Sequence, residues 1–121
     1  MRYLDQQDWE IASRYLFVDM TLRTIERDLN VLKQASPFKI TEPYIALLNK
    51  LKKVGTAERK KLKNTMHQKK ITVTLNEKQD SFTSYLFATK GKQEERNYFN
   101  PAIRKKVENI LNEWMNQGEE M

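Results

Sequence analysis

One long amphipathic helix is the strongest signal in this sequence. Apolar residues near the start of the chain recur at alternating intervals of four and three, which places them on a single helical face. Asp5 is suited to cap the first turn, and Asp8 favours the positive end of the helix dipole. We therefore predict a helix from Leu4 to Ala35, with a stripe formed by Ile11, Tyr15, Val18, Leu22, Ile25, Leu29 and Leu32.

This stripe has two open interpretations. It can pack against the rest of the same chain, or it can pair with a second copy in a coiled coil. We favour packing within the chain, because coiled coils usually sustain the pattern over more heptads with charged flanking positions. Apolar residues at positions 15–18 also spread beyond the stripe, as is typical of a helix covered on several sides.

Charged residues mark the solvated face of the same helix. Glu10 with Arg14, and Asp19 with Arg23, have the i,i+4 spacing and the order of charges that favour ion pairs. Such pairs add only a few tenths of a kcal/mol each, so we expect them to decorate the helix rather than to hold the fold.

Length and composition indicate one folded domain, residues 1–121. Two Trp, five Tyr and five Phe are too many for a disordered chain, and 121 residues suffice for one core. No apolar run is long enough to cross a bilayer, and the first ten residues lack the pattern of a signal peptide. We therefore expect a cytoplasmic protein with no membrane contact. The Lys- and Asn-rich composition is typical of an AT-rich bacterial genome.

Two further helices are predicted after the first. Pro37 ends the first helix, because proline disfavours helical geometry in the residue before it. Thr41 is suited to cap a second helix, which we expect to end at Gly55. Thr56 can then cap a third helix that reaches about Gln68 and has few apolar residues.

From Ile71 the apolar period changes to two, which predicts strands. We expect strands at 71–75 and 82–89 joined by a loop at 76–80, and then a type II′ turn at Gly91-Lys92 into a polar third strand that ends at Phe99.

Asn100-Pro101 begins a closing helix, which we expect to bury Trp114 against the long first helix and to end at Gly118. The predicted fold class is therefore α+β, mainly helical. It comprises three helices with a long first one, a β hairpin or short meander, and a closing C-terminal helix.

The positive charge of the chain is confined to one segment. The net charge is +6, yet residues 49–70 alone carry nine Lys and Arg against one acid, Glu58. A cluster of one sign is the footprint of a phosphate-binding surface. The predicted nucleic-acid-binding residues are Lys53, Arg59, Lys60, Lys61, Lys63, Asn64, His67 and Lys70.

The order of elements resembles the layout of a winged helix-turn-helix, with Gly55 in the turn and residues 71–89 as the wing. In that arrangement the lysines bind phosphates, and Arg59 and Asn64 read base edges. Acidic Glu77 and Asp80 in the wing loop count against it. The aromatic second strand also reads as core, so the hairpin is either a wing or part of the core.

Catalytic and metal-binding patterns are missing. The chain has no cysteine, one histidine and three glycines, and it lacks a glycine-rich phosphate loop. Adjacent Glu94 and Glu95 point to opposite faces of a strand and cannot share a metal. We expect no enzyme activity, metal or cofactor.

Two functions remain. The first is a small binding protein that contacts DNA or RNA, or an acidic protein, through residues 49–70. The alternative is a protein–protein interaction or homodimer through the long first helix. A lysine-rich helix that is merely solvated also fits the charge pattern.

Overall fold

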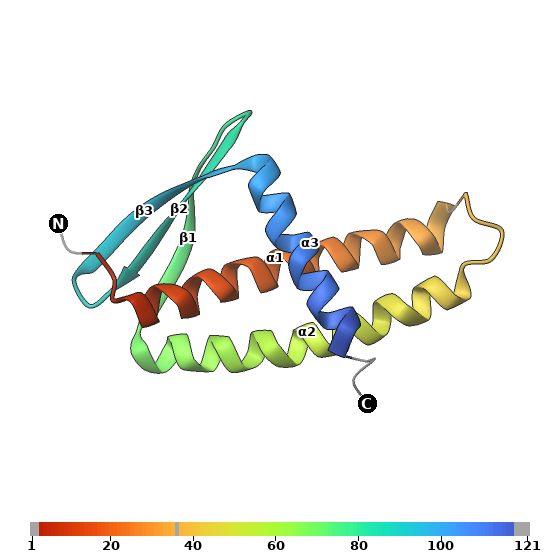
Figure 1. The fold of residues 1–121 in the computed structure, drawn as a ribbon, viewed down its shortest axis with the longest axis horizontal. Coiled ribbons are helices and arrows are strands. Elements are labelled where there is room, and N and C mark those ends of the chain that lie inside the picture. Colours follow the sequence, from red (N-terminus) through yellow and green to blue (C-terminus); the bar gives the residue numbers. More distant parts are fainter. Residues whose placement is uncertain (1–2, 36, 118–121) are drawn as a thin grey trace.

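The computed structural model describes residues 3–35 and 37–117, which form an α+β fold that is mainly helical (Figure 1). This confirms the predicted fold class, with its long first helix, its meander and its closing helix. The elements in chain order are α1 (Gln6–Ala35), α2 (Glu42–Lys69), β1 (Ile71–Lys78), β2 (Phe82–Thr89), β3 (Lys92–Phe99) and α3 (Asn100–Gln117).

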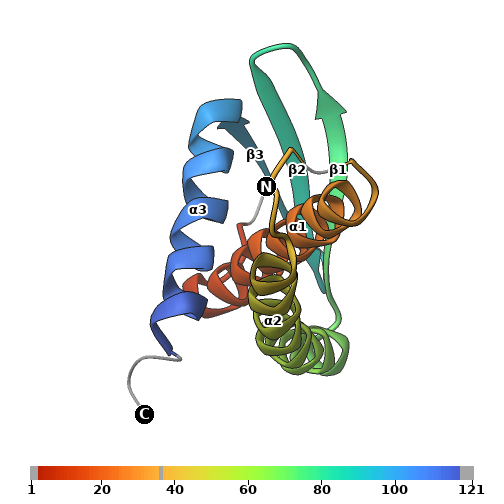
Figure 2. The ribbon, with the colours of Figure 1, turned by 90° about the vertical axis from the view of Figure 1, so that its right-hand side faces the viewer.

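Helix α1 lies at the centre of the molecule. Figure 2 shows it between α2, α3 and the sheet, each of which covers a different side. The middle of its apolar stripe is therefore buried within the chain: Val18, Leu22, Ile25 and Leu29 are at most 4% exposed. The stripe is the core of this protein, as the favoured interpretation predicted.

The predicted break at Gly55 is wrong, because α2 continues through this residue as one helix of 28 residues. Gly55 is buried where α3 packs against α1 and α2. A Cβ at this position would lie 2.5 Å from Trp114 Cη2 and 2.7 Å from Leu22 Cδ2. The glycine therefore allows close packing of the Trp114 ring rather than a turn. Without that turn, α2 forms no helix-turn-helix.

The three strands form an antiparallel meander in the order β1-β2-β3. Strand β2 has the predicted bounds, whereas β1 continues past Leu75 through a bulge, so most of the expected 76–80 loop is strand. The second turn is centred on Lys90-Gly91, one residue earlier than predicted, with φ values of 39° and 79°. Positive φ at both central residues is the type I′ pattern, not type II′.

The hairpin of residues 71–89 belongs to the core rather than to a wing. Its inner face carries Phe87, which is fully buried, together with buried Thr83 and Thr89. The tip between β1 and β2 points away from α2 in both ribbon views (Figures 1 and 2).

Trp114 on α3 is 1% exposed, which confirms the expected burial of this side chain. The predicted helix end at Gly118 lies outside the described residues.

Candidate nucleic-acid interface

Most of the cations of residues 49–70 are exposed on α2. Seven of the nine Lys and Arg side chains have high exposure and no ion-pair partner among the described residues. We call this set the α2 lysines. They are Lys50, Lys52, Lys53, Lys60, Lys61, Lys63 and Lys70.

The other two cations turn toward α1. Arg59 Nη1 donates to Asp19 Oδ1 at 3.0 Å, and Lys69 Nζ lies 3.0 Å from Asp8 Oδ1. Asp19 also binds Arg23, which confirms that predicted pair. The Arg59 guanidinium is held against a carboxylate of the neighbouring helix, so a contact from Arg59 to a base stays a prediction and would require this ion pair to open.

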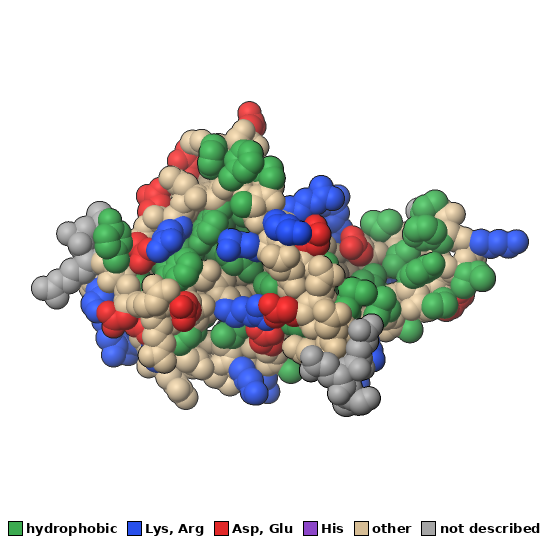
Figure 3. All heavy atoms as spheres, viewed as in Figure 1, with side chains coloured by type: hydrophobic (Ala, Val, Ile, Leu, Met, Phe, Trp, Pro, Cys, Tyr) green, Lys and Arg blue, Asp and Glu red, His purple; other side chains and the backbone are tan. Residues whose placement is uncertain are grey.

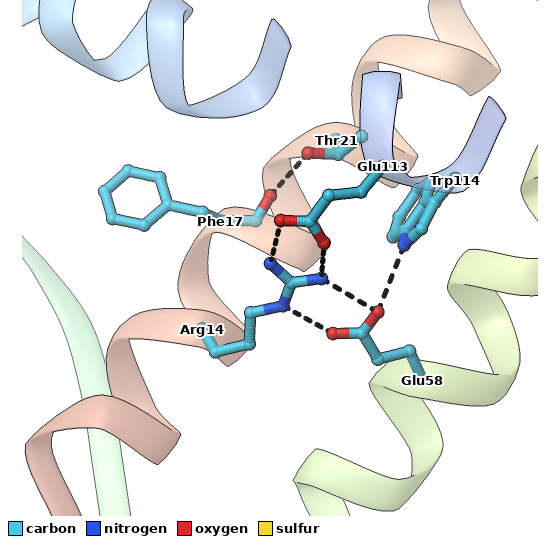
Figure 4. Close-up of polar contacts among 6 residues, drawn as sticks. All are labelled: Arg14, Phe17, Thr21, Glu58, Glu113 and Trp114. Atoms are coloured by element: carbon cyan, nitrogen blue, oxygen red, sulfur yellow. Dashed lines mark hydrogen bonds and ion pairs between the residues drawn. The ribbon is translucent and has the colours of Figure 1, made fainter. Parts of the chain in front are cut away.

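Glu58, the single acid of the segment, joins all three helices (Figure 4). Arg14 of α1 donates to both of its oxygens, at 2.5 Å from Nε and 3.1 Å from Nη2. Trp114 Nε1 of α3 donates to Glu58 Oε1 at 3.1 Å. Arg14 also binds Glu113 of α3 at 2.8 Å, so the predicted Arg14–Glu10 pair is replaced by two long-range partners.

This network favours the ionised form of Glu58. Burial raises the pKa of the Glu58 carboxyl, but hydrogen bonds from Arg14 and Trp114 together lower it below its ordinary value. The hydrogen bond to Glu58 likewise raises the pKa of the Arg14 guanidinium. The Glu58 carboxylate is therefore held in contacts with α1 and α3, and it shares the single positive charge of Arg14 with Glu113.

The remaining site residues fall into one strip and its flanks. Lys53, Lys60, Asn64 and His67 are separated by seven, four and three residues, so they share one exposed face of α2. Lys61 and Lys63 lie on either side of that face. Lys70 follows the helix in a left-handed conformation with φ 56°.

Lys50 and Lys52, which are not among the site residues predicted from the sequence, extend the surface toward the start of α2. Lys50 lies three residues before Lys53, so helical spacing alone places the two on neighbouring parts of the same face. This spacing is the signal that would have included Lys50. The exposed lysines from Lys50 to Lys70 then extend over about 30 Å of α2.

The chemistry that this surface offers is attraction of anions. Within residues 3–35 and 37–117, no three His, Asp or Glu side chains are grouped so that they could hold a metal ion. No helix in the described part of the chain combines the length and apolar character needed to cross a membrane.

The fold and this surface define a class of protein: a small, mainly helical α+β protein with a row of exposed lysines on its second helix. The chain belongs to the YhjD protein family, whose sequence model matches residues 3–119. It is similar to uncharacterized protein YhjD of Bacillus subtilis (strain 168), with 29% identity over 111 residues and 92% of each chain covered. No solved structure matches the chain.

Proposed function

We propose that this chain is a non-catalytic cytoplasmic protein that binds nucleic acid through the α2 lysines. The observation that carries the proposal is the set of seven exposed lysines with no ion-pair partner in the described structure, all from one helix and its cap. Lysine ammonium groups bind phosphate oxygens, and neutralising several phosphates releases counterions, which is the main source of affinity that does not depend on sequence.

The contacts we expect are to the sugar-phosphate backbone rather than to bases. Arg59, the side chain best suited to read guanine, is bound to Asp19. The tip between β1 and β2 lies on the side of the molecule opposite α2, so it cannot contact a duplex bound to α2 (Figure 1). Backbone contacts alone position a protein but carry no sequence information.

The test is a fluorescence anisotropy titration of the full chain with mixed-sequence duplex DNA and with single-stranded RNA, at low and moderate salt. Phosphate contacts predict affinity that falls steeply as salt rises. The variant Lys60→Glu/Lys61→Glu/Lys63→Glu is expected to lose binding at both salt concentrations.

The matched control is Lys33→Glu/Lys39→Glu/Lys105→Glu, which changes the net charge equally at exposed lysines outside α2. This control is expected to retain most of the affinity. Absence of binding at low salt, or equal losses in both triple variants, would contradict the proposal. Tighter binding to polyglutamate than to either nucleic acid would instead point to an acidic protein partner.

Self-association is a second candidate, and it is favoured by the end of the α1–α2 hairpin. Apolar side chains gather there, beyond the part of α1 that α3 and the sheet cover (Figure 3). We call the exposed set the hairpin end; its members are 40–63% exposed. They are Val31, Phe38, Ile40, Tyr44 and Leu47.

We infer that a second copy of the chain covers the hairpin end. A twofold interface uses the same surface on both copies, so it needs projecting groups and a hollow side by side. The hairpin end has both: rings of Phe38 and Tyr44, 5.5 Å apart, and a hollow of about 410 Å³ that they line with Leu47 and Leu48. The alternative of a coiled coil along α1 would require its core stripe to separate from the other elements.

Sedimentation velocity over a range of concentrations tests this second candidate. We expect a mass that rises with concentration, and a folded monomer for the variant Val31→Lys/Ile40→Lys. The control is Met115→Lys on α3, which replaces an apolar side chain of similar exposure, 44%, outside the hairpin end. A monomer at all concentrations would exclude self-association through this surface.

A further inference from the structure

A second concave surface lies where α1, the β1–β2 hairpin and α3 meet. Figure 2 looks along α1 toward this region, with α3 on one side and the hairpin on the other. The cleft has a volume of about 650 Å³, and no residue of α2 lines it. Binding sites for small molecules commonly have volumes of about 300–1,000 Å³. The cleft is therefore large enough for a ligand and separate from the α2 lysines.

Among the described residues, every charged side chain that lines the cleft is a cation. Arg27 comes from α1, Lys78 from β1 and Arg104 from α3, and none of the three has an ion-pair partner among the described residues. Arg23 adds a fourth cation, which is bound to Asp19 at 3.0 Å. Because the site is concave and the charges that line it have one sign, it focuses the field on an anion.

Polar and aromatic side chains form part of the lining of the cleft. The Tyr85 ring is half-buried, and its hydroxyl makes no hydrogen bond within the described structure. Burial raises the pKa of the Tyr85 phenol, so the hydroxyl stays a hydrogen-bond donor at neutral pH. Beside it, Thr83 Oγ1 donates to Asn100 Oδ1 at 2.8 Å, which fixes the Asn100 amide at the start of α3.

Apolar side chains complete the site. Leu75 is 58% exposed although it lies on the strand face that carries the core, and Ile103 and Val107 line the opposite wall from α3. A ligand that matches both the cations and the apolar side chains has a compact negative charge and a flat ring with apolar faces. Arginine pairs suit phosphate oxygens in particular, because the guanidinium can donate two parallel hydrogen bonds.

We propose that this cleft binds a mononucleotide, with its phosphates between Arg27, Lys78 and Arg104 and its base against Tyr85 and Leu75. The site is independent of the nucleic-acid surface on α2, because the two share no residue. Three cations from three separate elements meet only in the folded chain, so the cleft forms with the fold.

Calorimetric titration of the full chain with ATP, at moderate salt and without metal, tests the proposal. We expect saturable binding with one site per chain, binding of tripolyphosphate that is about tenfold weaker, and no binding of adenosine. The variant Arg27→Gln/Arg104→Gln removes two charge-assisted contacts and is expected to weaken ATP binding by about tenfold or more. Tyr85→Phe is expected to weaken it a few-fold without changing the fold.

The matched control is Lys53→Gln/Lys60→Gln on α2, which removes the same charge outside the cleft and is expected to leave ATP binding unchanged. Both pairs are exposed and lack ion-pair partners, so circular dichroism should show all variants folded. Equal affinity for ATP and tripolyphosphate, or greater loss in the α2 pair than in the cleft pair, would overturn the proposal. Absence of ATP binding would overturn it as well.

Discussion

Gly55 lies in the middle of α2, where a glycine costs about 1 kcal/mol relative to alanine. Replacing it with alanine should nevertheless destabilise the fold, because the added Cβ would lie 2.5 Å from the Trp114 ring and 2.7 Å from Leu22. Overpacking of a core costs about 1–3 kcal/mol. Because the gain in helix propensity offsets part of this cost, we expect Gly55→Ala to lower the free energy of unfolding by up to about 2 kcal/mol in urea titration.

Thr56→Ala is the control for that variant, since Thr56 is the next residue of α2 and is exposed. The alanine raises helix propensity at an exposed position that does not pack against α3. The free energy of unfolding should therefore stay within about 0.5 kcal/mol of the parent value. A Gly55→Ala protein that is more stable than the parent would show that the Trp114 ring has room to move.

Glu58 makes the stability depend on pH. Its pKa in the folded state lies below the ordinary value of 4.5, because hydrogen bonds from Arg14 and Trp114 outweigh the opposing effect of burial. A carboxyl with a lowered folded-state pKa stabilises the fold above its unfolded-state pKa, and this contribution is lost as the pH falls through the folded-state value.

We therefore expect Glu58→Gln to reduce the free energy of unfolding by about 1–2 kcal/mol at neutral pH, as for loss of a charged hydrogen bond. The difference from the parent should shrink as the pH falls below 4.5. Urea titrations at several pH values measure it. The control is Glu108→Gln, because Glu108 and its partner Lys105, 3.6 Å apart, are both exposed. Its free energy of unfolding should differ little from that of the parent at any pH.

At the scale of elements, the β2–β3 turn needs glycine for a reason opposite to that at Gly55. No atom of residues 3–35 or 37–117 lies within 4 Å of a Cβ built on Gly91, but its φ of 79° is a conformation that side chains disfavour. Gly91→Ala should therefore cost about 1 kcal/mol of stability through backbone strain alone. Gly91→Asn should cost less, because asparagine tolerates left-handed geometry. Equal losses in the two variants would contradict this account.

Elements whose signals are local could be predicted from the sequence. The four-and-three spacing in α1, the alternation in β2 and the Asn100-Pro101 start of α3 each specify their own structure. The predicted helix break at Gly55 is wrong because the glycine makes room for the ring of Trp114, which lies 59 residues further along the chain. Local patterns do not record a contact of that range.

The candidate site shows the same division between local and distant information. Charge counting located the lysines, since seven of the nine cations are exposed on one helix and its cap. It could not show that Arg59 is bound to Asp19, or that Glu58 is paired with Arg14. Nor could it find the cleft, because Arg27, Lys78 and Arg104 lie on three elements that only the fold brings together.

At the scale of the whole molecule, the surfaces with separate proposed roles point in different directions. The α2 lysines are exposed along α2, the end of the α1–α2 hairpin projects beyond α3 (Figure 1), and the cleft is lined by residues of α1, the sheet and α3. Central α1 contacts all the elements that carry them. Because the three surfaces share no residue, a variant at one of them should leave binding at the other two intact.

The salt dependence of nucleic-acid binding measures how much of the α2 surface is used. A straight helix about 30 Å long with lysines on several sides cannot place all of them on one duplex, so we expect about four phosphate contacts. Each contact contributes about −0.9 to the slope of log affinity against log salt for B-DNA, which predicts a slope near −4. Lys53→Gln/Lys60→Gln removes two side chains from the centre of the surface and should make the slope less steep by about 2. Lys33→Gln/Lys39→Gln should leave it unchanged, so a slope that responds equally to both pairs would mean that net charge, rather than the position of the α2 lysines, governs the affinity.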